Sequence, residues 1–189
     1  MSTAIFCKLG CLSKLSTLLS KHLPAMNKLS LIALLFAFVL NARAQEKPHI
    51  YNPTADARAE ITAAVKQAAT QHKNVLLQIG GNWCSWCIKF NNQVTTDSAL
   101  NTYLNKNYVV LHVNYSQENT NDAVMTSLGY PQRFGFPVFI VLDDKGNRLH
   151  TQNSEYLEEG KGYSKDKILG FFKAWSLGAL DPKSYNKTK

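Results

Sequence analysis

Four cysteines occur in the chain, and two of them, Cys84 and Cys87, form a closely spaced pair within residues 83–87 (WCSWC). Two thiols only three positions apart cannot tie distant parts of a fold together. The pair is therefore typical of redox chemistry or of ligand binding rather than of a disulfide-stapled scaffold. The other two cysteines, Cys7 and Cys11, fall in an N-terminal segment that we expect to be absent from the mature protein.

A metal ion is the main alternative ligand for this pair of thiols. Zinc takes four ligands in structural sites, and the sequence holds no second C-x-x-C pair and no closely spaced pair of histidines. His72, His112 and His150 are scattered along the chain, and thiol chemistry does not need them, so we expect structural roles for them. We predict no metal site and no dissolved cofactor, because two sulfurs can carry two electrons themselves.

An export signal is predicted near the N-terminus. Residues 26–44 combine a short basic start, the apolar run LIALLFAFVL and the small residues Ala-Arg-Ala before a possible cleavage point, which is the three-part secretory pattern. The run of ten apolar residues is shorter than the ~20 needed to span a bilayer. We expect cleavage after Ala44 and a periplasmic or secreted protein without a stable membrane anchor. Residues 1–25 are predicted to be an upstream extension. A retained anchor is the alternative.

Charge and composition narrow the class of the mature chain. The net charge of +8 is concentrated at the front, because five Lys and Arg and no acid precede Gln45, which leaves +3 for the rest. That balance removes the main argument for nucleic-acid binding. With 45% hydrophobic and 11% aromatic residues, the chain can bury one core. We predict one domain over residues 45–180, a polar tail over 181–189, and a monomer.

Hydrophobic periodicity predicts that helices and strands alternate in this domain. Ile61, Ala64 and Ala68 recur at helical spacing, and apolar runs such as residues 137–142 (PVFIVL) are typical of buried strands. We expect helices over about 56–71, 82–92, 97–104, 121–128 and 165–177, and strands over 74–79, 108–113, 137–142 and 148–152. Such an order implies a three-layer α/β domain with a mixed central sheet.

The cysteine pair lies where a strand gives way to a helix. The first residues of a helix carry backbone N–H groups without partners, and the helix dipole is positive there. An anion is stabilised at such a position, and a thiolate at Cys84 is an anion of this kind.

With these elements in place, the sequence resembles the thioredoxin family, in particular exported thioredoxin-like proteins. The resemblance rests on residues 83–87 between strand and helix and on Phe136-Pro137 before a strand. Residues 74–92 also look like the matching part of the C-terminal domain of DsbD-type thiol:disulfide interchange proteins. The resemblance covers roughly Thr54 to Leu177 and implies a thioredoxin-like α/β/α sandwich with a mixed central sheet.

The same resemblance implies a role for each matching residue. Cys84 is expected to attack a substrate disulfide, and Cys87 to resolve the mixed disulfide. Pro137 is expected to be a cis-proline that faces the cysteines, with the backbone of Phe136 offered to an extended substrate. Trp83 and Trp86 are expected to border the peptide groove.

Ordinary structural roles are the alternatives for these residues. Pro137 could be a trans proline at the start of a strand. Phe136, Trp83 and Trp86 could be core aromatics, which is the role that we expect for Trp175.

Two positions depart from the thioredoxin pattern. Gln78 stands where thioredoxins carry a buried acid that assists proton transfer at the second thiol. Because an amide cannot titrate, we predict slower or more pH-dependent resolution by Cys87. The dipeptide between the cysteines is Ser85-Trp86 rather than Gly-Pro. Since this dipeptide helps to set a redox poise that spans about −270 to about −120 mV, the motif leaves reductase, oxidase and isomerase all open.

Our preferred hypothesis is an exported thiol-disulfide oxidoreductase that reduces protein disulfides through Cys84 and Cys87. By resemblance, a membrane thiol reductase of DsbD type is the expected electron donor. The alternative is a binding module that holds an extended peptide or a soft metal such as Cu(I) without turnover.

Overall fold

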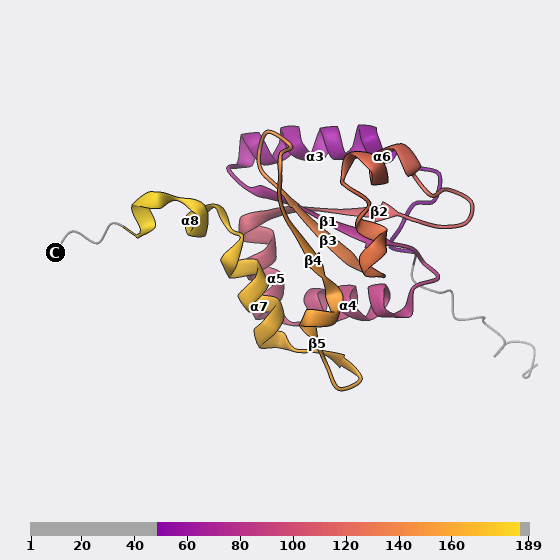
Figure 1. Cartoon of the computed structure of the whole chain (residues 1–189). Helices are drawn as coiled ribbons and strands as arrows, with labels where there is room; N and C mark the ends of the chain where they lie inside the picture. The colour runs from indigo at the N-terminus through magenta and orange to yellow at the C-terminus, as the bar shows by residue number, and fades with distance from the viewer. Residues whose placement is uncertain (1–48, 186–189) are drawn as a thin grey trace, which may run out of the picture. The chain divides into compact units, whose positions relative to one another are not determined.

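A mixed four-stranded sheet forms the centre of the fold (Figure 1). The computed structural model describes residues 49–185, so the predicted extension, signal segment and cleavage point lie outside the described residues. The strand order is β2-β1-β3-β4, with β1 and β2 parallel and the other neighbours antiparallel. The strands are β1 (Asn74–Gly80), β2 (Tyr108–Asn114), β3 (Val138–Leu142) and β4 (Arg148–Asn153).

Helices cover both faces of this sheet, as Figure 1 shows. One face is covered by α3 (Ala57–Gln71) and α6 (Asp122–Ser127). The opposite face is covered by α4 (Ser85–Thr96), α5 (Ser98–Asn107) and α7 (Lys165–Ala174). The predicted three-layer sandwich with a mixed sheet is therefore confirmed. Within residues 49–185, no helix is long and apolar enough to cross a membrane.

The side chains of the buried strand β1 alternate between the two faces of the sheet. Val75, Leu77 and Ile79 pack into the layer beneath α3 and α6, whereas Leu76 packs into the layer beneath α4, α5 and α7. Side chains alternate across a strand, so Gln78 joins Leu76 on the face of α4. A buried amide is thereby placed under the helix that begins at the cysteines.

Side-chain caps fix the starts of two helices. Asp56 Oδ1 accepts a hydrogen bond from Ala59 N at the start of α3. The predicted cap Asp97 is confirmed, because its carboxylate accepts from Ala99 N and Leu100 N at the start of α5. Lys165 Nζ, at the start of α7, lies 2.7 Å from Asp97 Oδ2. The carboxylate thus joins α5 and α7 at their N-terminal ends.

This contact predicts a pH-dependent contribution of Asp97 to stability. The Lys165 hydrogen bond, followed by the backbone N–H of Leu100, lowers the pKa of Asp97. A lowered folded-state pKa means that the stabilisation is present above the unfolded pKa and is lost as the pH falls through the folded value. Asp97→Ala should therefore lower the midpoint of thermal unfolding at about pH 7, and the difference from wild type should shrink by about pH 2.

The control for this prediction is Asp144→Ala. Asp144 lies in the turn after β3, and its carboxylate has no hydrogen-bond partner within residues 49–185. Its midpoint should stay near wild type at both pH values. An Asp97→Ala difference that is equally large at both pH values would contradict the electrostatic account.

The last helix differs from the sequence-based expectation. The predicted helix over 165–177 ends at Ala174, and a short helix α8 (Leu177–Leu180) follows. Ser176 has extended backbone angles, and both its N, at 3.4 Å, and its Oγ, at 3.0 Å, donate to Lys173 O at the end of the helix. Trp175, predicted to be a core aromatic, packs against the core cluster but is only half-buried, and its ring stacks on His150 with 4.2 Å between centroids.

A short hairpin between β4 and α7 was not predicted. It consists of β5 (Glu158–Glu159) and β6 (Gly162–Tyr163) and follows a 3₁₀ turn over Ser154–Leu157. The hairpin is fastened to α4, since Lys89 Nζ donates to Lys161 O at 2.6 Å and Gln93 Nε2 donates to Tyr163 O at 3.0 Å. The helix that carries the cysteines is therefore held from its outer side.

Candidate redox site

The two cysteines of the pair form a disulfide at the start of α4, with 2.10 Å between the sulfurs. Cys84 is the N-cap of the helix, and its Sγ accepts a hydrogen bond of 3.1 Å from Cys87 N. Cys84 is 5% exposed and Cys87 is fully buried. An incoming disulfide can thus reach the sulfur of Cys84 first. The sulfur of Cys87 lies behind it, close enough to bond to the sulfur of Cys84.

The surroundings of this disulfide are mostly apolar. Cys84 and Cys87 cluster with Tyr51, and Trp86 and Phe136 pack against them. Such surroundings disfavour the charge of a thiolate, whereas a disulfide carries no charge. The cluster therefore stabilises the oxidised pair relative to an ionised one.

A buried polar pair lies next to Cys87. Gln78 Nε2 donates to Tyr51 Oη at 2.8 Å and to Cys87 O at 3.2 Å. Tyr51 is 2% exposed, and burial raises the pKa of its hydroxyl well above the ordinary value. Its segment is held by Asn82, whose side chain accepts from Tyr51 N at 3.1 Å and donates to Tyr51 O at 2.8 Å. Sequence reasoning did not identify Tyr51.

Gly80, the last residue of β1, leaves the space that this arrangement needs. A Cβ at Gly80 would lie 2.4 Å from Cys87 Sγ and 2.9 Å from Tyr51 Oη, both closer than atoms can approach. Glycine is therefore required here by close approach. The same distances show that the sulfur of Cys87 and the hydroxyl of Tyr51 border one small space.

Pro137 and Phe136 lie at the same end of the sheet as the cysteines. The peptide bond between them is cis. Val138, the next residue, pairs with Ile79 near the end of β1. The half-buried ring of Phe136 lies edge-on to Trp83, 5.5 Å between centroids, and 4.8 Å from the ring of Tyr115.

The two tryptophans of the motif face different surroundings. Trp83 is 58% exposed, and its Nε1 donates to Tyr115 O at 2.8 Å. Trp86 packs edge-on against Tyr163 of the hairpin, 5.3 Å between centroids, and Lys89 Nζ lies 4.2 Å above its ring. Trp83 borders a mostly apolar hollow together with Tyr115, Ser116, Gln117, Glu118 and Thr120. Trp86 is not among the residues that line it.

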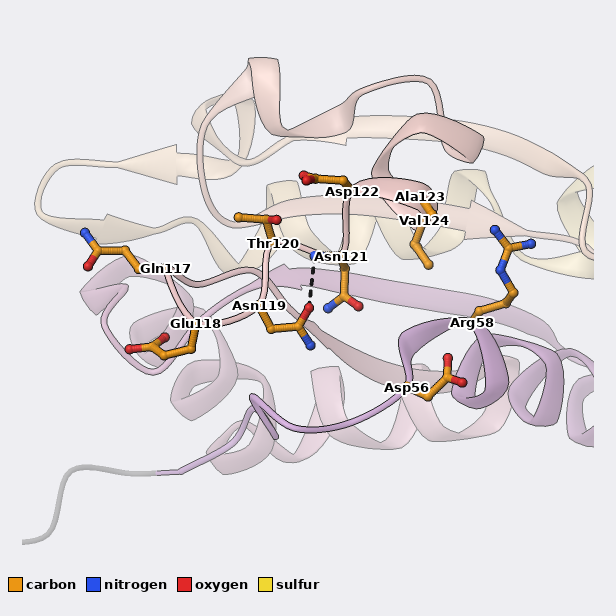
Figure 2. A pocket seen from close by; sticks show the side chains of 10 residues that line it. All are labelled: Asp56, Arg58, Gln117, Glu118, Asn119, Thr120, Asn121, Asp122, Ala123 and Val124. Atoms are coloured by element: carbon orange, nitrogen blue, oxygen red, sulfur yellow. Dashed lines mark hydrogen bonds between the residues drawn. The ribbon is translucent and has the colours of Figure 1, made fainter.

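The loop after β2 also lines a second, polar hollow. Figure 2 shows the loop and, opposite it, Asp56 and Arg58 at the start of α3. The loop is shaped by asparagines, since Asn121 N donates to Asn119 Oδ1 at 3.1 Å and Asn121 Nδ2 donates to Asn114 O at 2.8 Å. Gln117, Glu118 and Thr120 line both hollows.

Sequence reasoning also missed this loop, although the topology contained a signal for it. The carboxyl ends of parallel strands meet at one edge of a sheet, and Gly80 pairs with Asn114 at the ends of β1 and β2. The residues that follow β2 must therefore lie beside those that follow β1, which are the cysteines.

Within the described residues, a histidine but no cluster of possible metal ligands lies near the redox pair. Among residues 49–185, no three side chains of His, Cys, Asp or Glu gather closely enough to hold a metal ion. The half-buried ring of His112 lies edge-on to Tyr51, 5.4 Å between centroids, and burial lowers the pKa of this histidine. His112 is thus kept neutral near the redox pair.

A sandwich of this kind with a C-x-x-C disulfide at a helix start defines the class of thioredoxin-like redox domains. Residues 56–144, just under half of the chain, match the family described as thioredoxin-like, and the chain has the thioredoxin-like fold. No curated protein sequence matches the chain.

Two solved structures are similar to the chain, and the first of them shares its fold. The disulphide isomerase from Xylella fastidiosa Temecula1 is 24% identical, with a TM-score of 0.59, over 69% of this chain and 97% of that one. The oxidised C-terminal domain of DsbD from Neisseria meningitidis is 18% identical, with a TM-score of 0.45, over 61% of this chain and 93% of that one. The fold and the Cys84–Cys87 pair together support thiol-disulfide oxidoreduction as the chemistry of this site.

Proposed function

We propose that the protein is an exported thiol-disulfide oxidoreductase that reduces disulfides in other proteins. The observation that carries this direction is the burial of Cys84 and Cys87 in an apolar cluster. A dithiol becomes a stronger reductant when its ionised form is destabilised relative to its disulfide, just as stabilising the reduced form gives a strong oxidant. The hydrogen bond from Cys87 N to Cys84 Sγ and the positive end of the α4 dipole act in the opposite sense, and we propose that the burial of both sulfurs outweighs them.

The reaction balances without a cofactor. The thiolate of Cys84 attacks one substrate sulfur, forms a mixed disulfide and releases the other substrate sulfur as a thiolate. Cys87, once deprotonated, attacks the sulfur of Cys84, forms the intramolecular disulfide and releases the second substrate thiolate. The substrate gains two electrons, the protein loses two, and the two protons of the dithiol pass to the released thiolates or to water.

The binding surface proposed for the substrate is the hollow beside Trp83. An exposed indole and the ring of Tyr115 offer apolar area, and the edge-on contact of Phe136 with Trp83 brings the segment before β3 to the same place. An extended peptide that carries the disulfide fits this surface better than a small, enclosed ligand does.

The direct test is the redox equilibrium of the mature domain in graded dithiol and glutathione buffers, read by mass after alkylation. We expect a reduction potential below about −220 mV. A value near about −120 mV would instead indicate a disulfide donor. Failure to form the Cys84–Cys87 disulfide would favour a binding module. The name of the Xylella fastidiosa relative, a disulphide isomerase, makes reactivation of a scrambled disulfide protein the second assay.

The proposal of export rests on residues 26–44, and that of an electron donor on the compartment this implies. An oxidising compartment requires a supply of electrons for Cys84 and Cys87, for which we propose a DsbD-type membrane thiol reductase. N-terminal sequencing of protein from a Gram-negative host should show Gln45 as the first residue. Protein that stays in the cytoplasm with residues 26–44 intact would contradict the proposal of export.

A further inference from the structure

Cys87, the resolving cysteine, lies in surroundings that disfavour the loss of its proton. Cys87 is fully buried among apolar side chains, yet it must lose its proton before it can attack the sulfur of Cys84. Burial of this kind opposes the formation of a thiolate. Gln78, the buried polar residue behind Cys87, cannot accept the proton, because an amide does not titrate.

The hydroxyl of Tyr51 is the polar group that borders the sulfur of Cys87. A Cβ at Gly80 would lie 2.4 Å from Cys87 Sγ and 2.9 Å from Tyr51 Oη. The sulfur and the oxygen can therefore be no farther apart than the sum of these two distances. The clustering of Tyr51 with Cys84 and Cys87 agrees with this proximity.

The hydrogen bonds of Gln78 determine how the proton of Tyr51 can point. One nitrogen of Gln78, Nε2, contacts both Cys87 O at 3.2 Å and Tyr51 Oη at 2.8 Å. Since a carbonyl oxygen only accepts, the group at that position must be the NH₂, and Tyr51 Oη must accept from it as well. The proton of Tyr51 has no acceptor of its own within residues 49–185 and is free to turn toward the sulfur.

We propose that Tyr51 donates a hydrogen bond to the sulfur of Cys87 when that thiol ionises, and that Gln78 holds the tyrosine in the orientation this requires. The bond stabilises the thiolate, so that Cys87 can attack Cys84 near neutral pH. Its proton leaves to the substrate thiolate released in the first step or to water, and Tyr51 stays protonated throughout. The electron balance of the reaction is unchanged.

Burial of Tyr51 supports this role, because it raises the pKa of the phenol and keeps the donor proton in place. In the described part of the chain, residues 49–185, three titratable groups face the pair. His112 of β2 meets the ring of Tyr51 edge-on, Tyr163 of the hairpin acts to raise the pKa of Tyr51, and Cys84 itself is the third. None of these carries a positive charge near neutral pH that could take over the role.

The test measures ionisation of Cys87 directly in the reduced Cys84→Ser protein, by thiolate absorbance against pH. Tyr51→Phe added to this background removes only the hydroxyl. We expect the pKa of Cys87 to rise by about one to two units. Tyr108→Phe is the matched control, since it removes a buried hydroxyl that donates to Phe172 O on another part of the core. The control should leave the pKa of Cys87 unchanged.

A second variant guards against a purely structural explanation. Gln78→Met fills the same space but cannot donate to Tyr51 Oη, so it should raise the pKa of Cys87 by less than Tyr51→Phe does. In single turnovers, Tyr51→Phe should slow the release of the mixed disulfide about tenfold near pH 7, and raising the pH should restore the rate. A Tyr51→Phe protein whose Cys87 titrates as in the background, or whose slow step persists at high pH, would overturn the proposal.

The role of Tyr51 rests on the proposed function, but its test does not depend on it. The titration of Cys87 requires no substrate and no particular redox direction. If the reduction potential proves oxidising while Tyr51→Phe still raises the pKa of Cys87, the direction is wrong and the role of Tyr51 stands. If the potential is reducing and Tyr51→Phe leaves the pKa of Cys87 unchanged, the proposed direction stands and the role of Tyr51 is wrong.

Discussion

Cys84→Ser should abolish turnover of protein disulfides, with a loss of at least about a thousandfold relative to wild type. A serine hydroxyl does not ionise near neutral pH and cannot form the mixed disulfide, and Cys87 is fully buried behind the helix start and cannot replace it. The measurement is the rate of reduction of a model protein disulfide with excess dithiol donor, corrected for the donor alone. A Cys84→Ser protein that turns over at the wild-type rate would exclude the proposed activity as a thiol-disulfide oxidoreductase.

Cys87→Ser should fail in a different way. It keeps the thiol at the N-cap of α4, so the first attack still occurs, but the mixed disulfide can no longer be resolved from within. Covalent partners should therefore accumulate on Cys84 and should be released by added dithiol. Their identification by mass spectrometry would name the substrates. Equal trapping by Cys84→Ser would contradict the assignment of Cys84 as the attacking thiol.

Gly80→Ala should destabilise the oxidised protein by about 1–3 kcal/mol, because the new methyl group would overlap with Cys87 Sγ and Tyr51 Oη. The disulfide ties the sulfur in place, so the backbone of β1 must move instead. In the reduced protein the freed thiol can rotate away, and the penalty should be smaller. Urea unfolding of both redox forms measures the two penalties.

The matched control for this substitution is Gly170→Ala. Gly170 lies in the exposed face of α7, and a Cβ there would meet no atom within 4 Å. Alanine is a better helix former than glycine, so this variant should be more stable by about 0.5–1 kcal/mol in both redox forms. The two glycine substitutions should thus have opposite signs, and only Gly80→Ala should also make the reduction potential less negative. A stabilised Gly80→Ala protein would refute the packing argument.

Sequence patterns predicted most of the fold because the patterns reflect burial. The strand over β1 was visible as an apolar run, and the helix over α3 as a stripe of small apolar residues. Asp97 was recognisable as a helix cap from its type and position alone. These features depend on local spacing, and local spacing is what a single sequence contains.

The parts that escaped prediction depend on contacts between distant segments. Tyr51 lies 27 positions before Gln78 and precedes the first helix, where no periodicity marks it as buried. The strands of the hairpin are two residues long each, too short to show alternation. Trp175 has a large aromatic side chain of the kind that is usually buried, but α7 ends just before it, and its ring lies beside His150 at the edge of the core. In each case the tertiary partner, rather than the local sequence, decides the outcome.

The layer of apolar side chains beneath α4 and α7 has a consequence for how the protein is made. The family match ends at Asp144, and by that point the chain holds both cysteines and the sheet strand that carries Phe139. Phe90 of α4 already packs on Phe139, with 4.4 Å between ring centroids, but the rest of this core cluster arrives later, from the hairpin and α7, and includes Tyr163, Ile168, Phe171 and Phe172. A nascent chain that has emerged only as far as Asp144 would expose an apolar sheet face to water. Synthesis must therefore pass Phe172 before this core layer is complete, which makes the hairpin and α7 part of the folding unit rather than an appendage to it.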